Sequence, residues 1–324
     1  MYSTQFNISV TPLKNNDSNV VGKYSTYPRY SSKRIDEGGM RLEGKYKSND
    51  ANNPLVSVIT TVFNRELVIE KAICSVLNQT YSNIEYIIID GASHDGTLEI
   101  IKKYVDVIDY YVSEPDSGLY EGMNKGLELA HGEYLIILNS DDWYREDCIE
   151  RLIKEAQTQK LELVCALATE VDASGKVIRN IPMMPFGDNV RLRMPLRHET
   201  MLVSKSLYNR VGLYDQSYKI IGDLKLTQRM YEAMIGFSQM SEYLMCFRKI
   251  GVASQLNKEF VLERKRLLLE QFTFLKDFEL ELLANEYKGD PLPYSNLVKK
   301  YSYNSKFVKS VKEFLRMHGI TLST

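Results

Sequence analysis

The feature that most constrains the fold is a fourfold alternation of short apolar runs and helical stretches beginning at Pro54. The apolar runs are rich in β-branched residues, as expected of strands that are buried on both faces. Short connections between strands and helices in this order favour parallel strands joined by crossover helices. The pattern therefore predicts an α/β fold with a Rossmann-like, mainly parallel central sheet and helices on both faces.

Each element can be assigned to a stretch of the sequence. The four strands are predicted at Leu55–Phe63, Ile84–Ile89, Val107–Val112 and Glu133–Leu138. Helices are predicted to follow at 66–79, 96–104, 119–127 and 148–157, with Asn64 and Asp95 capping the first two. Later elements are expected at 161–171 (strand), at a hairpin turning on Ser174-Gly175, at Ser204–Val211 and Asp223–Ala233 (helices), and at Tyr243–Phe247 (strand).

The chain divides into three predicted segments. Residues 1–53 are polar and turn-rich and are expected to form an N-terminal extension, 54–250 the α/β domain, and 251–324 a helical C-terminal region. The extension is basic between Lys23 and Lys47, with seven Lys/Arg against three Asp/Glu. This segment would either bind an acidic partner surface or be partly ordered against the body of the protein.

The C-terminal region is strongly helical from about residue 257 to 287, and a last helix is expected to about His318. From Tyr287 onward it carries seven Lys/Arg against two Asp/Glu. Its apolar residues Phe307, Val311, Phe314 and Leu315 share one helix face. This face would dock on the body or on a second subunit as a homodimer, or else make a peripheral membrane contact.

Composition excludes several classes of protein. With 41 Lys+Arg against 42 Asp+Glu, the net charge of −1 gives no basis for a nucleic-acid-binding role. No stretch reaches the roughly 18 apolar residues of a membrane span, and the N-terminus lacks the order of a signal peptide. Four cysteines without C-x-x-C spacing argue against a disulfide framework or a zinc site. We therefore expect a cytoplasmic protein.

Polar residues stand where the predicted strands end. Asn64, Asp90, Asp116 and the pair Asp141-Asp142 follow the four strands in turn. Ligands of open α/β sheets bind in the crevice beyond these carboxyl ends, so the four positions should converge. An acid pair directly after a buried strand needs a cation or hydrogen bonds to offset its repulsion. Few oxygen ligands, with room for water and phosphate, suit Mg²⁺ or Mn²⁺.

Three stretches carry a family resemblance: VSVITTVFNRE, then SVLNQTYSNIEYIIIDGASHDGT, then SEPDSGLYEGMNKGLELAHGEYLIILNSDD. Together they resemble the family 2 glycosyltransferases, which are nucleotide-sugar-dependent enzymes of GT-A fold, many of them builders of bacterial surface polysaccharides. The resemblance is dense from Pro54 to Trp143 and thinner to Phe247. It implies a nucleotide-sugar half at 54–143 and an acceptor half at 144–250.

The resemblance assigns roles by position. Asp141 and Asp142 occupy the family's Asp-x-Asp element, and both are implied ligands of Mn²⁺ or Mg²⁺, with Asp142 the main one. Lys125 could also be an ordinary solvated helix residue. The implied nucleotide-binding residues are Thr60, Phe63, Asn64, Glu66, Asp90, Asp116, Gly118, Asn124, Lys125 and Asp141.

The acceptor side is implied by LRHETMLVSKSLYNRVGLYDQSYKIIGDLKLTQR. His198, Glu199 and Trp143 would face the acceptor, and Asp223 would be the general base of an inverting displacement. Asp223 could instead be only a helix cap, His198 a structural histidine and Trp143 a core residue. Glu199 stands where Gln is common and Lys225 where a second acid is common, so acceptor choice is in question.

These observations predict a metal-dependent inverting glycosyltransferase that uses a nucleoside-diphosphate sugar, most simply a UDP-sugar. Its acceptor would be a glycan or lipid-linked glycan in surface polysaccharide biosynthesis, at the inner face of the plasma membrane. Two alternatives stay open. One is a nucleotidyltransferase of similar fold, although no Gly-rich triphosphate loop follows the first strand. The other is a non-catalytic sugar-nucleotide-binding subunit, because fold does not fix function.

Overall fold

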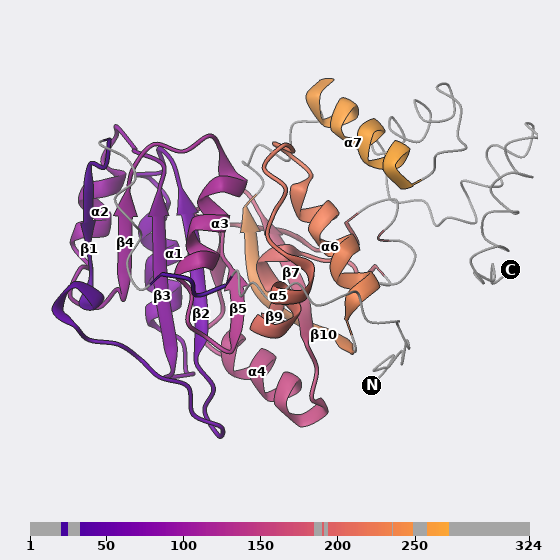
Figure 1. Cartoon of the computed structure of the whole chain (residues 1–324), viewed down its shortest axis with the longest axis horizontal. Coiled ribbons are helices and arrows are strands. Elements are labelled where there is room, and N and C mark those ends of the chain that lie inside the picture. Colours follow the sequence, from indigo (N-terminus) through magenta and orange to yellow (C-terminus); the bar gives the residue numbers. More distant parts are fainter. Residues whose placement is uncertain are drawn as a thin grey trace, which may run out of the picture. The chain divides into compact units, whose positions relative to one another are not determined.

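A ten-stranded mixed sheet forms the centre of the computed structural model (Figure 1). Its strand order is β1-β4-β3-β2-β5-β9-β7-β10-β6, and β8 pairs with β7. The strands are β1 (Asp36–Gly38), β2 (Val56–Val62), β3 (Ile84–Asp90), β4 (Tyr110–Ser113), β5 (Tyr134–Ile137), β6 (Trp143–Tyr144), β7 (Leu163–Val171), β8 (Val177–Asn180), β9 (Leu202–Ser204) and β10 (Phe237–Arg248). The α-helices are α1 (Ile69–Leu77), α2 (Thr97–Lys102), α3 (Leu119–Leu129), α4 (Cys148–Gln159), α5 (Lys205–Val211), α6 (Gly222–Ala233) and α7 (Lys258–Gln271).

The structure describes residues 21–24, 33–184, 190, 194–234, 236–248 and 258–271. They belong to two compact units. The first comprises residues 1–190 and 194–254 and contains the whole sheet, while the second comprises 191–193 and 255–324 and contains α7. The predicted last helix and its apolar face lie outside the described residues. No helix in the described part of the chain combines the length and apolar character needed to cross a bilayer.

The four predicted strands form the parallel core of the sheet. β2 pairs in parallel with both β3 and β5, and β3 pairs in parallel with β4. Every residue of these four strands is buried, as expected of strands covered on both faces. The α/β prediction is confirmed. β1, β6, β8 and β9 add antiparallel pairings around this core.

Alternate residues of β2 face opposite sides of the sheet. Val58 belongs to a core with α1, α2 and α4, while Ile59 faces α3. A Cβ added to Gly126 of α3 would lie within 2.2 Å of the Ile59 side chain, so the helix approaches the strand more closely than any other residue would allow. The two helical layers on either side of the sheet place their loops around its carboxyl edge.

Most local predictions hold, with three corrections. The hairpin turns at Gly175 with a φ of +87°. Asp95 accepts a hydrogen bond from the Thr97 backbone N–H, but the residue that directly precedes α2 is Gly96, so Asp95 is not the N-cap of this helix. Asn64 is not the cap of α1. It adopts a left-handed φ of 52°, and the helix begins later, after Val68. β10 is also much longer than predicted, because it pairs with β7 along nearly its whole length.

The basic N-terminal segment binds the body of the protein. β1 pairs antiparallel with β4 and covers that edge of the sheet. Arg34 forms an ion pair with Glu114, and Lys47 forms one with Asp109. The acidic surface that was expected to bind this basic segment is therefore formed, in part, by acidic residues of the same chain.

A buried polar cluster holds the same segment to β3. Arg41 forms an ion pair with Glu85, whose side chain is 2% exposed. Glu85 Oε2 also accepts hydrogen bonds from the Ser57 hydroxyl at 2.5 Å and from the His131 backbone N–H at 2.8 Å. Burial alone would raise the pKa of Glu85, but the His131 hydrogen bond, the Arg41 charge and the Ser57 hydroxyl outweigh it and lower the pKa to about 2.

We expect the substitution Glu85→Gln to destabilise the first unit by roughly 3 kcal/mol at pH 7, since it removes the carboxylate that forms an ion pair with the buried Arg41 guanidinium. The folded pKa lies below the unfolded one of about 4.5, so this stabilisation is complete above pH 4.5 and is lost as the pH falls toward 2. Thermal unfolding of both proteins from pH 7 to pH 3 should show the difference in Tm shrinking below pH 4.5. A constant difference would contradict the linkage.

Candidate functional site

The carboxyl ends of the parallel strands bring Asp90 and Asp116 together. Asp90 is fully buried at the end of β3, where Ser93 and Ser113 donate hydroxyl hydrogen bonds to its two carboxylate oxygens at 2.5 and 2.6 Å. A Cβ added to Gly91 would lie 2.9 Å from Asp116 Oδ2, so the second carboxylate sits directly over this turn. Burial raises the pKa of Asp116, and the charge of Asp90 adds to that rise.

The loops after β2 and β3 are tied to each other. Asn64 Oδ1 accepts a hydrogen bond from the His94 backbone N–H, and Glu66 Oε2 accepts one from the Gly96 N–H at 2.7 Å. The Phe63 ring is 52% exposed and meets the His94 ring edge-on at 5.6 Å. Phe63, Asn64 and Glu66 thus form one wall beside the carboxyl ends, with an aromatic ring available to a planar ligand.

Thr60 does not reach this wall. Its side chain is fully buried on the α1 side of the sheet, where its hydroxyl accepts a hydrogen bond from the Tyr86 hydroxyl at 3.2 Å. The neighbouring Thr61 faces the other side, against Gly122 of α3, and its hydroxyl has no hydrogen-bond partner in the structure. Alternate residues of a strand face the same side of the sheet, so Thr60 faces the same side as the core residues Val58 and Val62. This alternation could have been read from the sequence alone.

Three further residues implied in nucleotide binding lie around α3. Gly118 precedes the helix with a φ of +135°, a conformation that favours glycine. Lys125 is buried between Glu114 and Glu121, at 2.9 and 3.3 Å, and is not a solvated residue. Asn124 uses both polar ends of its amide on the backbone of a single residue, Tyr214. The Asn124 side chain therefore joins α3 to the acceptor-side segment.

Asp141 and Asp142 follow β5 and share their surroundings with Glu199. Asp142 is 1% exposed; its Oδ1 accepts a hydrogen bond from the Arg248 backbone N–H at 2.8 Å, while Oδ2 has no partner. Glu199 is 3% exposed; its Oε1 accepts a hydrogen bond from Asn139, while Oε2 has none. Burial, followed by the charges of Glu199 and Asp141, raises the pKa of Asp142 well above its ordinary value.

The unpartnered oxygen of Asp142 suits a hard cation. A buried carboxylate oxygen without a hydrogen bond is costly unless a ligand satisfies it. Among the described residues, no group of three or more His, Cys, Asp or Glu side chains is arranged to hold a metal. An ion held by Asp141 and Asp142 would keep waters and substrate oxygens as most of its ligands, as Mg²⁺ does and as Mn²⁺ can.

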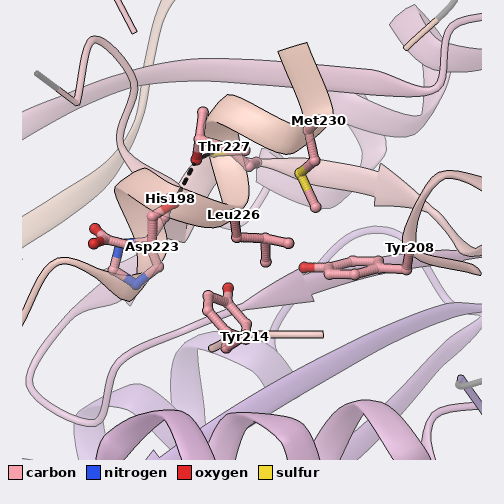
Figure 2. A pocket seen from close by; sticks show the side chains of 8 residues that line it. His198, Tyr208, Tyr214, Asp223, Leu226, Thr227 and Met230 are labelled. Atoms are coloured by element: carbon pink, nitrogen blue, oxygen red, sulfur yellow. Dashed lines mark hydrogen bonds and ion pairs between the residues drawn. The ribbon is translucent and has the colours of Figure 1, made fainter. Parts of the chain in front are cut away.

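On the acceptor side, Asp223 opens α6 and lies beside His198. Figure 2 shows the two at one end of a narrow cavity whose other lining residues are largely apolar or aromatic. His198 Nδ1 lies 3.6 Å from Asp223 Oδ2 and 3.5 Å from Glu199 Oε2. Asp223 Oδ1 accepts a hydrogen bond from the Tyr120 hydroxyl at 3.2 Å. Burial raises the pKa of Asp223, and the neighbouring His198 opposes that rise.

Tyr120 is a residue that the sequence reading missed. Its single hydroxyl hydrogen is shared between Asp223 and the Ile220 carbonyl, whose oxygen lies closer at 2.8 Å, and its ring stacks on Tyr214 with 5.3 Å between the ring centroids. A Cβ on Gly222 would collide with the Tyr120 ring, so only glycine fits at this position at the start of α6. No local signal separates this tyrosine from an ordinary helix residue, because its partners lie about 100 residues away.

Two other acceptor-side residues have defined neighbours. Lys225, which stands where an acid was expected, forms an ion pair with Asp215 at 2.8 Å. Trp143 is half-buried in β6, and the Lys71 ammonium lies 3.2 Å from its ring centroid. Trp143 is therefore not fully buried in the core, and its ring is not fully open for a sugar to stack on it.

Comparisons with known proteins place these residues in a family context. Residues 57–216 match the family model described as glycosyl transferase family 2. The putative glycosyltransferase EpsH of Bacillus subtilis is 32% identical over 39% of this chain and 37% of the relative. The putative teichuronic acid biosynthesis glycosyltransferase TuaG, from the same organism, is 39% identical over 31% of this chain and 41% of the relative. The matched segments thus span well under two thirds of these relatives.

The fold has solved counterparts. The crystal structure of Staphylococcus aureus TarS residues 1–349 in complex with UDP-GlcNAc superposes with a TM-score of 0.56. The match has 18% sequence identity and covers 72% of this chain and 71% of TarS 1–349. This similarity confirms the predicted GT-A architecture.

We expect Glu199→Gln to stabilise the metal-free protein, because it removes one of two buried like charges. A relief of about 1–3 kcal/mol would raise the Tm by about 2–4 °C per kcal/mol. The measurement is thermal unfolding in EDTA at pH 8. The control Glu162→Gln, which breaks the ion pair with Arg210, should lower the Tm. A lower Tm for Glu199→Gln as well would show that Glu199 stabilises the empty site.

Proposed function

Because the chain belongs to glycosyl transferase family 2, we propose that it transfers a sugar from a nucleoside-diphosphate sugar, with UDP as the nucleotide, to a glycan or lipid-linked glycan. The observation that carries this proposal is the buried Asp142, with an unpartnered oxygen at the carboxyl end of the sheet and within the family-matched segment. The names of TuaG and of the UDP-GlcNAc complex of TarS support a surface polysaccharide as the product and a UDP-sugar as the donor.

The donor would lie along the carboxyl edge. The exposed Phe63 ring is available to stack on the base, and the Asp90 carboxylate lies at the end of the neighbouring strand. Gly118 at the start of α3 lets the backbone approach the sugar and phosphates closely. Asp142, with Asp141, would hold Mn²⁺ or Mg²⁺. Such an ion neutralises charge that develops on the departing diphosphate.

Asp223 is the proposed general base. Its burial raises its pKa, which makes the carboxylate a better proton acceptor near neutral pH. The Tyr120 hydrogen bond fixes one oxygen, and the second oxygen faces His198. The base would take the proton of the acceptor hydroxyl as that oxygen attacks the anomeric carbon opposite the diphosphate. A single displacement of this kind inverts the anomeric configuration.

A thermal-shift panel of UDP-, GDP- and dTDP-sugars, with and without Mn²⁺, tests the donor assignment. We expect a UDP-sugar with Mn²⁺ to raise the Tm of the wild type, since a ligand that binds only the folded state stabilises it. Asp142→Asn should lose the Mn²⁺-dependent part of the shift. Asp147→Asn, at the start of α4, should keep it. A full shift in the Asp142 variant would exclude Asp142 as a ligand.

Asp223→Asn tests the base. Hydrolysis of the UDP-sugar selected by that panel should slow by about 100-fold or more, the usual contribution of general base catalysis. The donor Kd should change little, because Asp223 contacts the attacking group only. Tyr120→Phe should slow turnover less, since the carboxylate itself remains and only one hydrogen bond to it is lost. Weaker donor binding with unchanged turnover would refute the role of Asp223.

A further inference from the structure

A chain of ion pairs connects the N-terminal extension to the loop 115–118, which precedes α3. It begins at Arg34, whose side chain is 7% exposed. The extension pairs with β4 through β1 (Figure 1), and the Ile35 backbone N–H donates to the Ser113 carbonyl at 2.9 Å. This pairing places Arg34 beside Glu114, the first residue after β4, at the carboxyl edge of the sheet.

The Glu114 carboxylate is shared between two cations from different parts of the chain. Its Oε2 accepts hydrogen bonds from Arg34 Nε at 3.2 Å and Nη2 at 3.1 Å, while its Oε1 lies 2.9 Å from Lys125 Nζ. The side chains of Glu114 and Lys125 are each 5% exposed. Because water screens buried ion pairs little, the Arg34 guanidinium fixes the orientation in which the carboxylate meets Lys125.

Lys125 extends the chain of ion pairs to the loop itself. Its ammonium lies 3.3 Å from Glu121 Oε1 and donates to the Pro115 carbonyl at 3.4 Å. The other oxygen of Glu121 accepts hydrogen bonds from the Ser117 backbone N–H at 2.8 Å and from the Ser117 hydroxyl at 2.5 Å. The loop 115–118 is therefore held at two points by groups whose positions depend on Lys125.

This loop carries two residues of the proposed donor site, Asp116 and Gly118. Asp116 Oδ1 accepts a hydrogen bond from the Gly118 backbone N–H at 3.0 Å, so the two residues are positioned together. Residues 114–118 belong to neither a strand nor a helix. Segments of this kind open easily unless side chains hold them, so the ion pairs contribute directly to the shape of the donor site.

Arg34 comes from outside the segment that matches the family model, which covers residues 57–216. The guanidinium is itself held in place. Its Nη1 donates to Glu37 Oε2 at 3.0 Å, and the same oxygen accepts a hydrogen bond from the Tyr110 hydroxyl of β4 at 2.8 Å. The extension thus presents a fixed positive charge to the carboxyl edge of the sheet.

We propose that Arg34 is a positioning residue of the donor site, which acts through this chain of ion pairs to hold the loop 115–118 in the conformation that binds the nucleotide sugar. The inference rests on the proposed function. Without the guanidinium, the Glu114 carboxylate loses one of its two cations, and the loop has to be ordered at the moment the donor binds. That ordering reduces the affinity for the donor.

The test compares Arg34→Gln with Lys47→Gln. Both substitutions remove an ion pair between the extension and one end of β4, but Lys47 pairs with Asp109 at the amino end, away from the loop. With Mn²⁺ present, calorimetry should give a Kd of UDP about 5- to 20-fold higher for Arg34→Gln and unchanged for Lys47→Gln. Arg34→Lys, which keeps a positive charge beside Glu114, should restore most of the affinity.

Amide hydrogen exchange provides a measurement that needs no ligand. The backbone N–H groups of Ser117 and Gly118 donate to side-chain carboxylates at this loop. In the nucleotide-free protein, both amides should exchange several-fold faster in Arg34→Gln than in the wild type or in Lys47→Gln.

A second variant tests the other end of the chain of ion pairs. Glu121→Ala removes the last link at a side chain that is 27% exposed, so the fold of the extension is unaffected. The Kd of UDP should rise as it does for Arg34→Gln. An unchanged Kd for Glu121→Ala would overturn the inference even if Arg34→Gln did not fold.

Other results would also overturn the inference. Equal losses of UDP affinity in Arg34→Gln and Lys47→Gln would show that the extension only stabilises the fold. Unchanged affinity and exchange in Arg34→Gln, with UDP bound by the wild type, would exclude the positioning role while the proposed function stands. A wild type that binds no UDP, GDP or dTDP with Mn²⁺ would overturn the proposed function and the inference together.

Discussion

Desolvated negative charge at the carboxyl edge of the sheet is the constraint on which the rest of this structure depends. Asp142 and Glu199 are both buried, and each has one oxygen without a hydrogen bond. In water such repulsion would be screened, but here little solvent separates the two groups. The protein tolerates this arrangement because the surrounding sheet and helices hold the backbone in place. The free energy stored there becomes available to any ligand that brings positive charge.

The parts around this centre are rigid for identifiable reasons. The Ser93 and Ser113 hydroxyls fix Asp90, and the hydrogen bonds between the loops after β2 and β3 fix the exposed Phe63. On the far side, Tyr120 reaches from α3 to the start of α6 and holds Asp223. A site built in this way requires little rearrangement when a ligand enters, which lowers the cost of binding.

The fold was predictable because its signal is local. Buried parallel strands must be apolar and short, and the residues that follow them must be polar, so the four strands and Asp90, Asp141 and Asp142 could be identified in order. Thr60 was assigned to the nucleotide site because it belongs to the family motif. The strand alternation that places Val58 and Val62 in the core places Thr60 there as well. Asn64 was misread as a cap, because its left-handed backbone and its bonds to His94 depend on a loop 30 residues away.

By itself the sequence determined the parallel sheet, the order of its strands along the chain and the set of acids at its edge, since periodicity and strand ends are properties of neighbouring residues. Only the tertiary structure decided which of those acids lie close together and which residues from distant segments join them. Glu199, Tyr120 and Arg248 reach the centre from segments about 60 to 100 residues from their partners. These charges and hydrogen bonds contribute only after folding has brought the residues together and removed the water between them. A local sequence pattern does not show which distant residues will become neighbours.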